Sequence, residues 1–407
     1  MPLNILHIST RLIVGGSQEN TVLSCEGQAR LGHDVHLAFG PIFGPEGSML
    51  DRVRTFATDN GARITTHDVP DMVREISPLR DLRCYRQLRA LIADIKPDVV
   101  HTHSSKAGIL GRWAAWNSAH KSKPRPAVIH TVHGPPFMPI EGGLAKRTAV
   151  RSKNAIYTLA ERFAAKRCHR IVSVADAMTE QFLARCIGDE SQYITVRSGM
   201  EIEPFVAAGD DPAVRARVRQ KLGIDADDFV IGTVARLAEH KGHDDLLDAL
   251  ADDLRAKPDW KLLWIGDGWW RDRLLARAES LGVRAQIATT GLVPPRQVAL
   301  HMAAMDVLAH PSAREGLPRT VPQALLCGIC PVAYDVDGTG EACRTGETGV
   351  LVPPGDVPGL RAAIARLAED PNERQRLAAN GRAECCEQFS AHRMVEELER
   401  VYALALV

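Results

Sequence analysis

The stretch DVLAHPSAREGLPRTVPQALLCGICPVAY, residues 306–334, decides the fold class. A short apolar run at 306–309 leads through a polar loop into a helical segment that Gly328 ends, and a second apolar run follows at 330–334. A strand, a helix and a strand in this order are typical of a parallel sheet with a crossover helix. Pro318 suits the first helical turn, where a backbone amide has no acceptor within the helix. The stretch therefore predicts an α/β fold.

The same alternation of short apolar runs and longer amphipathic stretches extends over the whole chain. Such runs predict buried parallel strands joined by helices. The predicted strands are Asn4 to Ser9, Asp34 to Ala38, Asp98 to Thr102, Ala127 to Val132, Arg170 to Val174, Tyr193 to Val196, Phe229 to Val234, Lys261 to Ile265, Gln286 to Thr290, Asp306 to Ala309, Cys330 to Tyr334 and Gly349 to Leu351. We therefore expect two Rossmann-like, doubly wound domains whose strand carboxyl ends face a central cleft.

The domain boundary is expected in the polar, proline-bounded stretch MEIEPFVAAGDDP, residues 200–212. The periodic pattern stops there and resumes with a predicted helix at 213–222. We expect an N-terminal domain at 1–203, a C-terminal domain at 204–388, and a terminal helix at 389–407 that packs back towards the N-terminal domain.

Composition excludes several classes of protein. The 407 residues contain 50 basic and 50 acidic side chains, which argues against a nucleic-acid partner. Nine cysteines without a framework argue for reduced thiols in a cytoplasmic protein. For Cys327 and Cys330 we favour a helix end running into a strand over a redox or metal site. No apolar run approaches the roughly 18 residues that cross a bilayer, so we expect a soluble protein.

Two loops that follow predicted strands carry groups suited to an anionic ligand. Gly15 and Gly16 open a helix, whose first amides can face anionic oxygen, although an ordinary strand-to-helix turn fits equally. Arg236 and Lys241 lie in ARLAEHKG after another strand, where two cations suit a diphosphate. Two solvated loop cations are the alternative.

The loop and helix at 311–328 hold a further candidate site. Glu315 offers a carboxylate beside the backbone amides of Gly316 and Leu317, a combination that suits an anion and sugar hydroxyls. Gln323 lies about two helical turns further on, so its side chain is expected on the same side. An ordinary capped crossover helix is the alternative.

Three histidines end predicted strands of the first half. His133 either donates to a phosphate near neutral pH or bonds to backbone as a structural residue. His101 and His103 lie two apart on one strand face, as a metal chelate requires, but no acidic residue with suitable spacing supports a metal.

The stretch 144–170 predicts a basic amphipathic helix, which either lies on an anionic membrane or is an ordinary crossover helix.

The sequence resembles the family 4 (group 1) glycosyltransferases, the large retaining group with the GT-B fold, over essentially the whole chain. Each motif alone is weak, but their order and spacing are specific. The motifs are GG near the N-terminus, VHTHSSKAGILGR at 100–112, HTVHG at 130–134, ARLAEHKG at 235–242, IGDG at 265–268 and HPSAREGLPRTVPQALLCG at 310–328.

The resemblance implies an acceptor-side N-terminal domain and a donor-binding C-terminal domain. It implies that Arg236 and Lys241 hold the donor diphosphate, that Glu315 contacts the transferred sugar, and that His133 reaches the sugar and β-phosphate. The family has a second acid eight positions after the first, where this chain has Gln323. The implied donor site comprises Gly16, Arg236, Lys241, Gly266, Leu292, Glu315, Gly316, Leu317 and Gln323, and the implied catalytic residues are Glu315, His133, Arg236 and Lys241.

The activity implied by the resemblance is that of a retaining hexosyltransferase, EC 2.4, with a UDP-sugar donor and a glycan or lipid-linked hydroxyl acceptor. The process would be polysaccharide or glycolipid biosynthesis, in the cytoplasm or peripherally at the inner face of the plasma membrane. No cofactor and no metal requirement are expected. The alternatives are a non-catalytic sugar-nucleotide-binding protein, which Gln323 in place of an acid would suit, and a GT-B-fold sugar-nucleotide epimerase.

Overall fold

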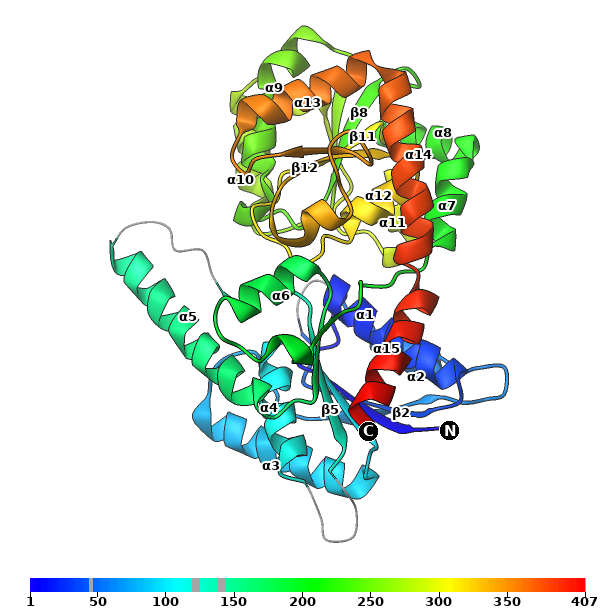
Figure 1. The fold of residues 1–407 in the computed structure, drawn as a ribbon. Coiled ribbons are helices and arrows are strands. Elements are labelled where there is room, and N and C mark those ends of the chain that lie inside the picture. Colours follow the sequence, from blue (N-terminus) through cyan, green and yellow to red (C-terminus); the bar gives the residue numbers. More distant parts are fainter. Residues whose placement is uncertain (44–46, 119–124, 138–143, 407) are drawn as a thin grey trace. The chain divides into compact units, whose positions relative to one another are not determined.

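The computed structural model describes residues 1–43, 47–118, 125–137 and 144–406, and of 144–146 only the backbone. The chain forms two compact units, one of residues 1–200 with 391–407 and one of residues 201–390. Each unit has a parallel sheet covered by helices on both faces (Figure 1). The terminal helix α15 (Ala391–Leu406) belongs to the first unit.

The first unit contains a seven-stranded parallel sheet in the order β3-β2-β1-β4-β5-β6-β7. Its strands are β1 (Asn4–Ser9), β2 (Asp34–Phe39), β3 (Ile64–Asp68), β4 (Val99–His103), β5 (Ala127–Val132), β6 (Arg170–Ser173) and β7 (Tyr193–Thr195). Its helices are α1 (Gly16–Arg30), α2 (Leu50–Thr55), α3 (Pro78–Ile95), α4 (Ser105–Trp116), α5 (Leu144–Ala165), α6 (Asp176–Leu183), the short η1 (Glu190–Gln192) and α15.

Alternate residues of the central strands build two cores, one on each face of this sheet. Leu6 and Ile8 of β1 contact residues of α3 and α4, such as Leu88. Ile5 of β1 packs on the other face with residues of α1 and α15, such as Leu398. Strands β1, β4 and β5 are covered on both faces, so apolar residues occupy both sides of each strand. Histidine and threonine are the main polar residues within them.

The second unit contains a six-stranded parallel sheet in the order β10-β9-β8-β11-β12-β13. Its strands are β8 (Phe229–Val234), β9 (Trp260–Ile265), β10 (Ile287–Thr289), β11 (Val307–His310), β12 (Cys330–Tyr334) and β13 (Val350–Val352). Its helices are α7 (Glu203–Asp210), α8 (Pro212–Leu222), α9 (His243–Ala256), α10 (Arg271–Ser280), α11 (Pro295–Met302), α12 (Thr320–Leu326), α13 (Val357–Glu369), α14 (Pro371–Gln388) and the short η2 (Glu239–Lys241), η3 (Arg284–Gln286) and η4 (Asp337–Glu341).

The six strands of the second sheet follow the order of the first six in the first sheet, which confirms the predicted α/β class with two Rossmann-like domains. In the first sheet the strand order reverses direction between β1 and β4, and in the second between β8 and β11. Ligands of doubly wound sheets bind outside the strand carboxyl ends at such switch points. The loops after β1, β4, β8 and β11 are therefore the places to look for a site.

Two predictions from the sequence are wrong in detail. Strand β3 was not predicted, because it is an edge strand in which only Ile64 is fully buried and no apolar run marks it. The stretch 200–212, where the periodic pattern was expected to stop, contains helix α7. Pro204 occupies the first turn of α7, where a missing amide is tolerated, and Phe205 and Ala208 are buried.

The remaining expectations concern cysteines and membrane spans. All nine cysteines are free, with Cys327 at the end of α12 and Cys330 at the start of β12, as predicted. Among the described residues, every helix is too short or too polar to cross a bilayer.

Candidate active site

Four neighbouring strands of the second sheet deliver predicted site residues from their carboxyl ends. Arg236 follows β8 and Gly266 follows β9, while Leu292 comes three residues after the end of β10. Glu315 follows β11 by five residues. Since β10, β9, β8 and β11 are adjacent in this order, the four loops share one edge of the sheet. The predicted residues from these loops thus belong to one region around the β8/β11 switch point.

The centre of this region is a hydrogen-bonded cluster of charges. Lys241 Nζ donates to Glu315 Oε1 at 2.6 Å, and His310 Nε2 donates to the same oxygen at 3.1 Å. Burial raises the pKa of the Glu315 carboxyl, but Lys241 and His310 more than offset it, so this pKa lies well below its usual range. Glu315 is therefore a carboxylate throughout the physiological pH range.

The approach of two loops brings Lys241 to Glu315. His240 O accepts hydrogen bonds from Ala313 N at 2.9 Å and from Ser312 Oγ at 3.1 Å. Gly242 has a φ of 72°, and a Cβ built there would lie 1.8 Å from Pro311 O. Glycine is required at this position both by the left-handed backbone and by the contact with Pro311.

Two groups of the cluster carried no role in the sequence analysis. Asp337 Oδ2 accepts a hydrogen bond from the Glu315 backbone amide at 2.6 Å, and Gly316 O accepts one from Gly338 N at 2.9 Å. His310 ends β11 and also contacts Thr320 Oγ1 through Nδ1 at 3.2 Å. Their signal in the sequence is that each lies at or just after the end of a predicted strand.

The structure corrects the expected geometry of the 311–328 segment. Helix α12 begins at Thr320, so Pro318 precedes the helix and does not occupy its first turn. Glu315 and Gln323 are consequently not spaced along one helix, because the backbone from Glu315 to Arg319 follows an irregular loop path. Gln323 is almost fully buried in α12, as is Leu317 in the loop.

An exposed tryptophan lies beside the predicted diphosphate cation. The guanidinium carbon of Arg236 is 5.5 Å from the centroid of the Trp269 ring, within the range of a cation–π contact. Trp269 is 68% exposed and follows the glycine loop after β9. A large planar surface and a cation thus lie together in the loops that follow β8 and β9.

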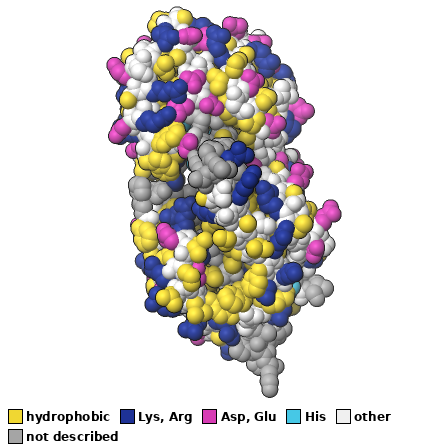
Figure 2. All heavy atoms as spheres, turned by 90° about the vertical axis from the view of Figure 1, so that its left-hand side faces the viewer, with side chains coloured by type: hydrophobic (Ala, Val, Ile, Leu, Met, Phe, Trp, Pro, Cys, Tyr) yellow, Lys and Arg dark blue, Asp and Glu magenta, His cyan; other side chains and the backbone are white. Residues whose placement is uncertain are grey.

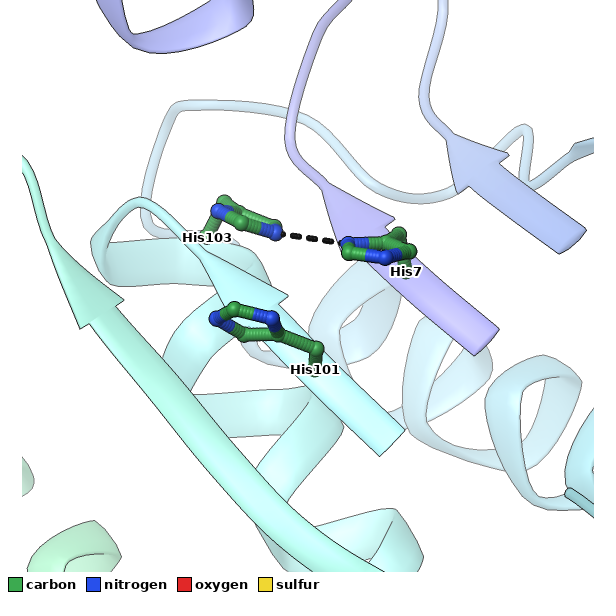
Figure 3. Close-up of side chains that lie close together, drawn as sticks. All are labelled: His7, His101 and His103. Carbon is green, nitrogen blue, oxygen red and sulfur yellow. Dashed lines mark hydrogen bonds between the residues drawn. The ribbon is translucent and has the colours of Figure 1, made fainter. Parts of the chain in front are cut away.

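The first unit holds the remaining predicted residues. Gly16 is the first residue of α1, in the segment that follows β1. His133 follows β5 directly and is half-buried, with its Nε2 3.0 Å from His103 Nδ1. His101 and His103 share a face of β4, as predicted, and His7 of β1 joins them (Figure 3).

Helix α5 covers most of the predicted basic stretch, and its side chains from residue 147 onwards are described. A buried ion pair, Arg112 Nη2 to Glu161 Oε2 at 2.5 Å, fixes it to α4. Ile156, Leu159 and Phe163 are nevertheless exposed. Figure 2 shows the left-hand side of the view in Figure 1, and on this face Lys and Arg side chains lie among hydrophobic ones.

Comparison with known proteins agrees with this architecture. A family model described as "Glycosyl transferases group 1" matches residues 214–384, and a "Glycosyl transferase 4-like domain" model matches residues 15–199. Among solved structures, that of HepE from Anabaena with UDP-glucose superposes with a TM-score of 0.77 at 20% identity, covering 98% of this chain and 99% of that one.

Two curated relatives match most of the chain. The UDP-Gal:alpha-D-GlcNAc-diphosphoundecaprenol alpha-1,3-galactosyltransferase of Escherichia coli is 25% identical over 337 residues, 82% of each chain. The putative glycosyltransferase EpsD of Bacillus subtilis is 28% identical over 326 residues, 80% of this chain and 81% of that one.

The two Rossmann-like domains and the similarity to HepE place the chain in the GT-B fold class. Within that class, the chain belongs to the family 4 (group 1) glycosyltransferases, as its motifs predicted. It is a glycosyltransferase.

Proposed function

We propose that this glycosyltransferase transfers a sugar from a UDP-sugar to a hydroxyl acceptor with retention of anomeric configuration, in polysaccharide or glycolipid biosynthesis. The observation that carries the proposal is the Lys241–Glu315 pair at the β8/β11 switch point. It places a cation for a diphosphate and a carboxylate for sugar hydroxyls within one hydrogen bond of each other.

The donor diphosphate binds Arg236 and Lys241 in this proposal. The amides of Gly316 and Leu317 bind the sugar and its phosphate, and Gly266 and Leu292 line the nucleotide from the loops after β9 and β10. Gln323 takes the place of the acid that contacts the ribose, since an amide also hydrogen-bonds hydroxyls. Trp269 supplies a stacking surface beside Arg236.

Glu315 orients the sugar and stabilises the positive character that develops at its anomeric carbon. The bond from that carbon to the β-phosphate oxygen breaks, and the acceptor oxygen bonds to the same face. The acceptor proton passes to the departing phosphate, so the step needs no protein base. Arg236 and Lys241 stabilise the charge on the leaving diphosphate, which is usually the largest electrostatic contribution. No metal is required, because the two cations provide this charge.

The first unit contributes His133, which contacts the donor sugar and β-phosphate, and Gly16 at the start of α1. Support for a UDP-sugar comes from the relatives, since the Escherichia coli enzyme is named for UDP-Gal and HepE was solved with UDP-glucose. The name of the Escherichia coli enzyme also includes a diphosphoundecaprenol-linked acceptor, which favours a lipid-linked acceptor for this chain.

A lipid-linked acceptor requires the enzyme to reach a membrane surface, and we assign that contact to α5. Ile156, Leu159 and Phe163 are spaced by three and four residues, so they form one exposed apolar row. Exposed Lys153 lies three residues before Ile156, next to this row. An amphipathic helix of this kind binds anionic bilayers in the interface plane.

Turnover with defined donors tests the proposal. The purified chain is incubated with UDP-, GDP- and ADP-sugars and a polyprenyl-diphosphate-linked sugar, with and without EDTA, and nucleotide release and the product anomer are measured. We expect UDP release that EDTA does not abolish and a product with the donor's anomeric configuration. Release from another donor only, an inverted product, or loss of turnover with EDTA would each contradict the corresponding part.

A further inference from the structure

Three histidines from neighbouring strands form a continuous hydrogen-bonded chain in the first unit. His7 Nδ1 lies 2.9 Å from His103 Nε2, and His103 Nδ1 lies 3.0 Å from His133 Nε2. The rings of His7 and His103 stack with 5.2 Å between centroids, and Figure 3 shows the two nitrogens facing each other. The chain thus runs from the interior of β1 to the segment after β5, where His133 is placed in the proposed function.

The inner end of the chain is anchored by a glutamine. Gln28 of α1 accepts a hydrogen bond from His7 Nε2 at 2.7 Å through its Oε1. Its amide nitrogen donates to Tyr402 Oη of α15 at 2.9 Å. Tyr402 Oη in turn lies 2.6 Å from His101 Nδ1, and His101 Nε2 lies 2.7 Å from Thr131 Oγ1. In this arrangement the Gln28 amide presents its oxygen to His7 and its nitrogen to Tyr402.

Burial keeps the inner rings of the chain neutral. It lowers the pKa of His7 to about 4 and the pKa of His103 well below its ordinary value. A neutral imidazole carries one proton, so a ring that donates through one nitrogen must accept through the other. His7 donates to Gln28 and so accepts from His103. His103 then accepts at Nδ1 from His133 Nε2–H.

We propose that His7, His103 and Gln28 are positioning residues that fix the tautomer and the ring orientation of His133. The chain keeps the His133 proton on Nε2 and leaves Nδ1 as the nitrogen that can accept a hydrogen bond or a further proton. A carboxylate or carbonyl plays this part for many catalytic and metal-binding histidines. Here two neutral imidazoles and an amide do so. The inference rests on the proposed role of His133 at the donor.

The same region has the composition of a metal site, since ring nitrogens of His7, His101 and His103 lie within 4.8 Å of one another. Both nitrogens of each of these three rings, however, already contact another protein group. A cation would have to displace several of these hydrogen bonds, and the three-residue group offers it no carboxylate. The hydrogen-bonded chain is therefore the arrangement that the geometry favours.

Imidazole ¹⁵N NMR of the full-length protein tests the tautomer directly. His133 is assigned by its loss in His133→Gln, and its ring shifts are recorded without ligand. We expect the Nε2–H form in the unsubstituted protein and a mixture of tautomers in His103→Leu. His103→Gln retains a donor and an acceptor in line, so it should restore the Nε2–H form. His36→Gln, in the separate His36–His67 pair, is the matched control and should leave the His133 shifts unchanged.

Kinetics provides the second readout. In His103→Leu, kcat should fall about 10- to 100-fold with little change in KM for the sugar nucleotide, and His103→Gln should recover most of it. If His103→Leu does not fold, Gln28→Leu breaks the hydrogen-bonded chain two residues further from His133 and carries the same expectation.

The proposal would be overturned by an Nδ1–H tautomer of His133, by an unchanged tautomer in both chain-breaking variants, or by one equivalent of tightly bound zinc in the purified protein. Because the tautomer is read without donor or turnover, these results do not depend on the proposed function. A protein that shows the expected tautomers but no turnover would instead contradict the proposed function alone.

Discussion

Six strands of the first sheet and the six of the second follow the same order, yet the carboxyl ends of the two sheets carry opposite kinds of polar chemistry. At the β8/β11 switch point a lysine, a carboxylate and a histidine meet in a charged cluster close to the surface. At the β1/β4 switch point His7 and His103 are fully buried and bond to each other through their rings. One topology thus provides fixed charges in one unit and uncharged donors and acceptors in the other.

The difference follows from the cost of burying charge. Removing an ion from water costs several kcal/mol, so cations that must meet a diphosphate stay partly hydrated until it binds. Lys241 and Glu315 keep 18% and 13% of their side-chain surface exposed. A chain of neutral rings must instead be buried. Water would offer each ring a competing hydrogen-bond partner, and the ring would no longer be held in one tautomer. Four predictions test this contrast.

Acid should produce the largest difference between the two units, in how much folding stability each one loses. The folded-state pKa of His7 is about 4 against an ordinary 6.5, so between these values the unfolded chain binds a proton that the folded chain does not. The stability of the first unit therefore falls as pH drops from about 6.5 to about 4, by about 3 kcal/mol for His7 alone. His101 and His103, whose pKa values burial also lowers, add to this loss.

Urea unfolding at pH 7 and pH 5, followed through amide NMR signals of each unit, measures this loss. The second unit contains His243, whose pKa burial also lowers to about 4, so it should lose stability too but less than the first unit. Equal losses in the two units would contradict the contrast between a neutral and a charged switch point.

Glu315→Gln keeps the shape of the charged cluster and removes its carboxylate. We expect turnover to fall about 100- to 1,000-fold, since the charge that stabilises the anomeric centre is lost. The matched control is Glu369→Gln at the exposed end of α13, which should leave turnover unchanged. Steady-state nucleotide release measures both. Full activity in Glu315→Gln would remove the carboxylate from the mechanism.

A pair of glycine substitutions isolates the loop contact that brings Lys241 to Glu315. Gly242 and Gly223 have similar φ values of 72° and 67°, but a Cβ at Gly242 meets Pro311 O at 1.8 Å whereas a Cβ at Gly223 meets nothing within 4 Å. Both alanine variants bear the left-handed penalty of about 1–2 kcal/mol. Gly242→Ala should lose a further ~1–3 kcal/mol of stability by overpacking, and it alone should weaken nucleotide binding. Equal effects in urea titrations would show that the contact is unimportant.

The sequence predicts the parallel α/β fold well, because buried parallel strands are apolar runs, and the predicted runs match twelve of the thirteen strands in the described part of the chain. The exception, β3, is an edge strand whose residues after Ile64 are all polar and at least partly exposed. Site residues at strand ends could also be predicted from the sequence, since Arg236 and Glu315 follow recognisable strands. The contact of Lys241 with Glu315 spans 74 positions and depends on how two loops meet, which no local pattern encodes.

The histidine chain lay further beyond prediction. His103 and His133 are visible as single residues at strand ends, but their connection depends on β1, β4 and β5 being neighbours. Its anchor joins Gln28 to Tyr402 across 374 positions. Tautomers follow from this complete network and from burial, and a sequence displays neither.

The most direct test of the central claim, that the charged edge of the second unit binds the donor diphosphate without metal, is calorimetric titration of the full-length protein with UDP in EDTA. Lys241→Ala and Arg236→Ala are compared with Lys257→Ala, which removes a cation at the far end of α9. We predict that the first two raise the Kd about 10- to 100-fold, the worth of a hydrogen bond to a charged group, and that Lys257→Ala leaves it unchanged. Equal Kd values in all three variants, or UDP binding that appears only with added magnesium, would contradict the claim.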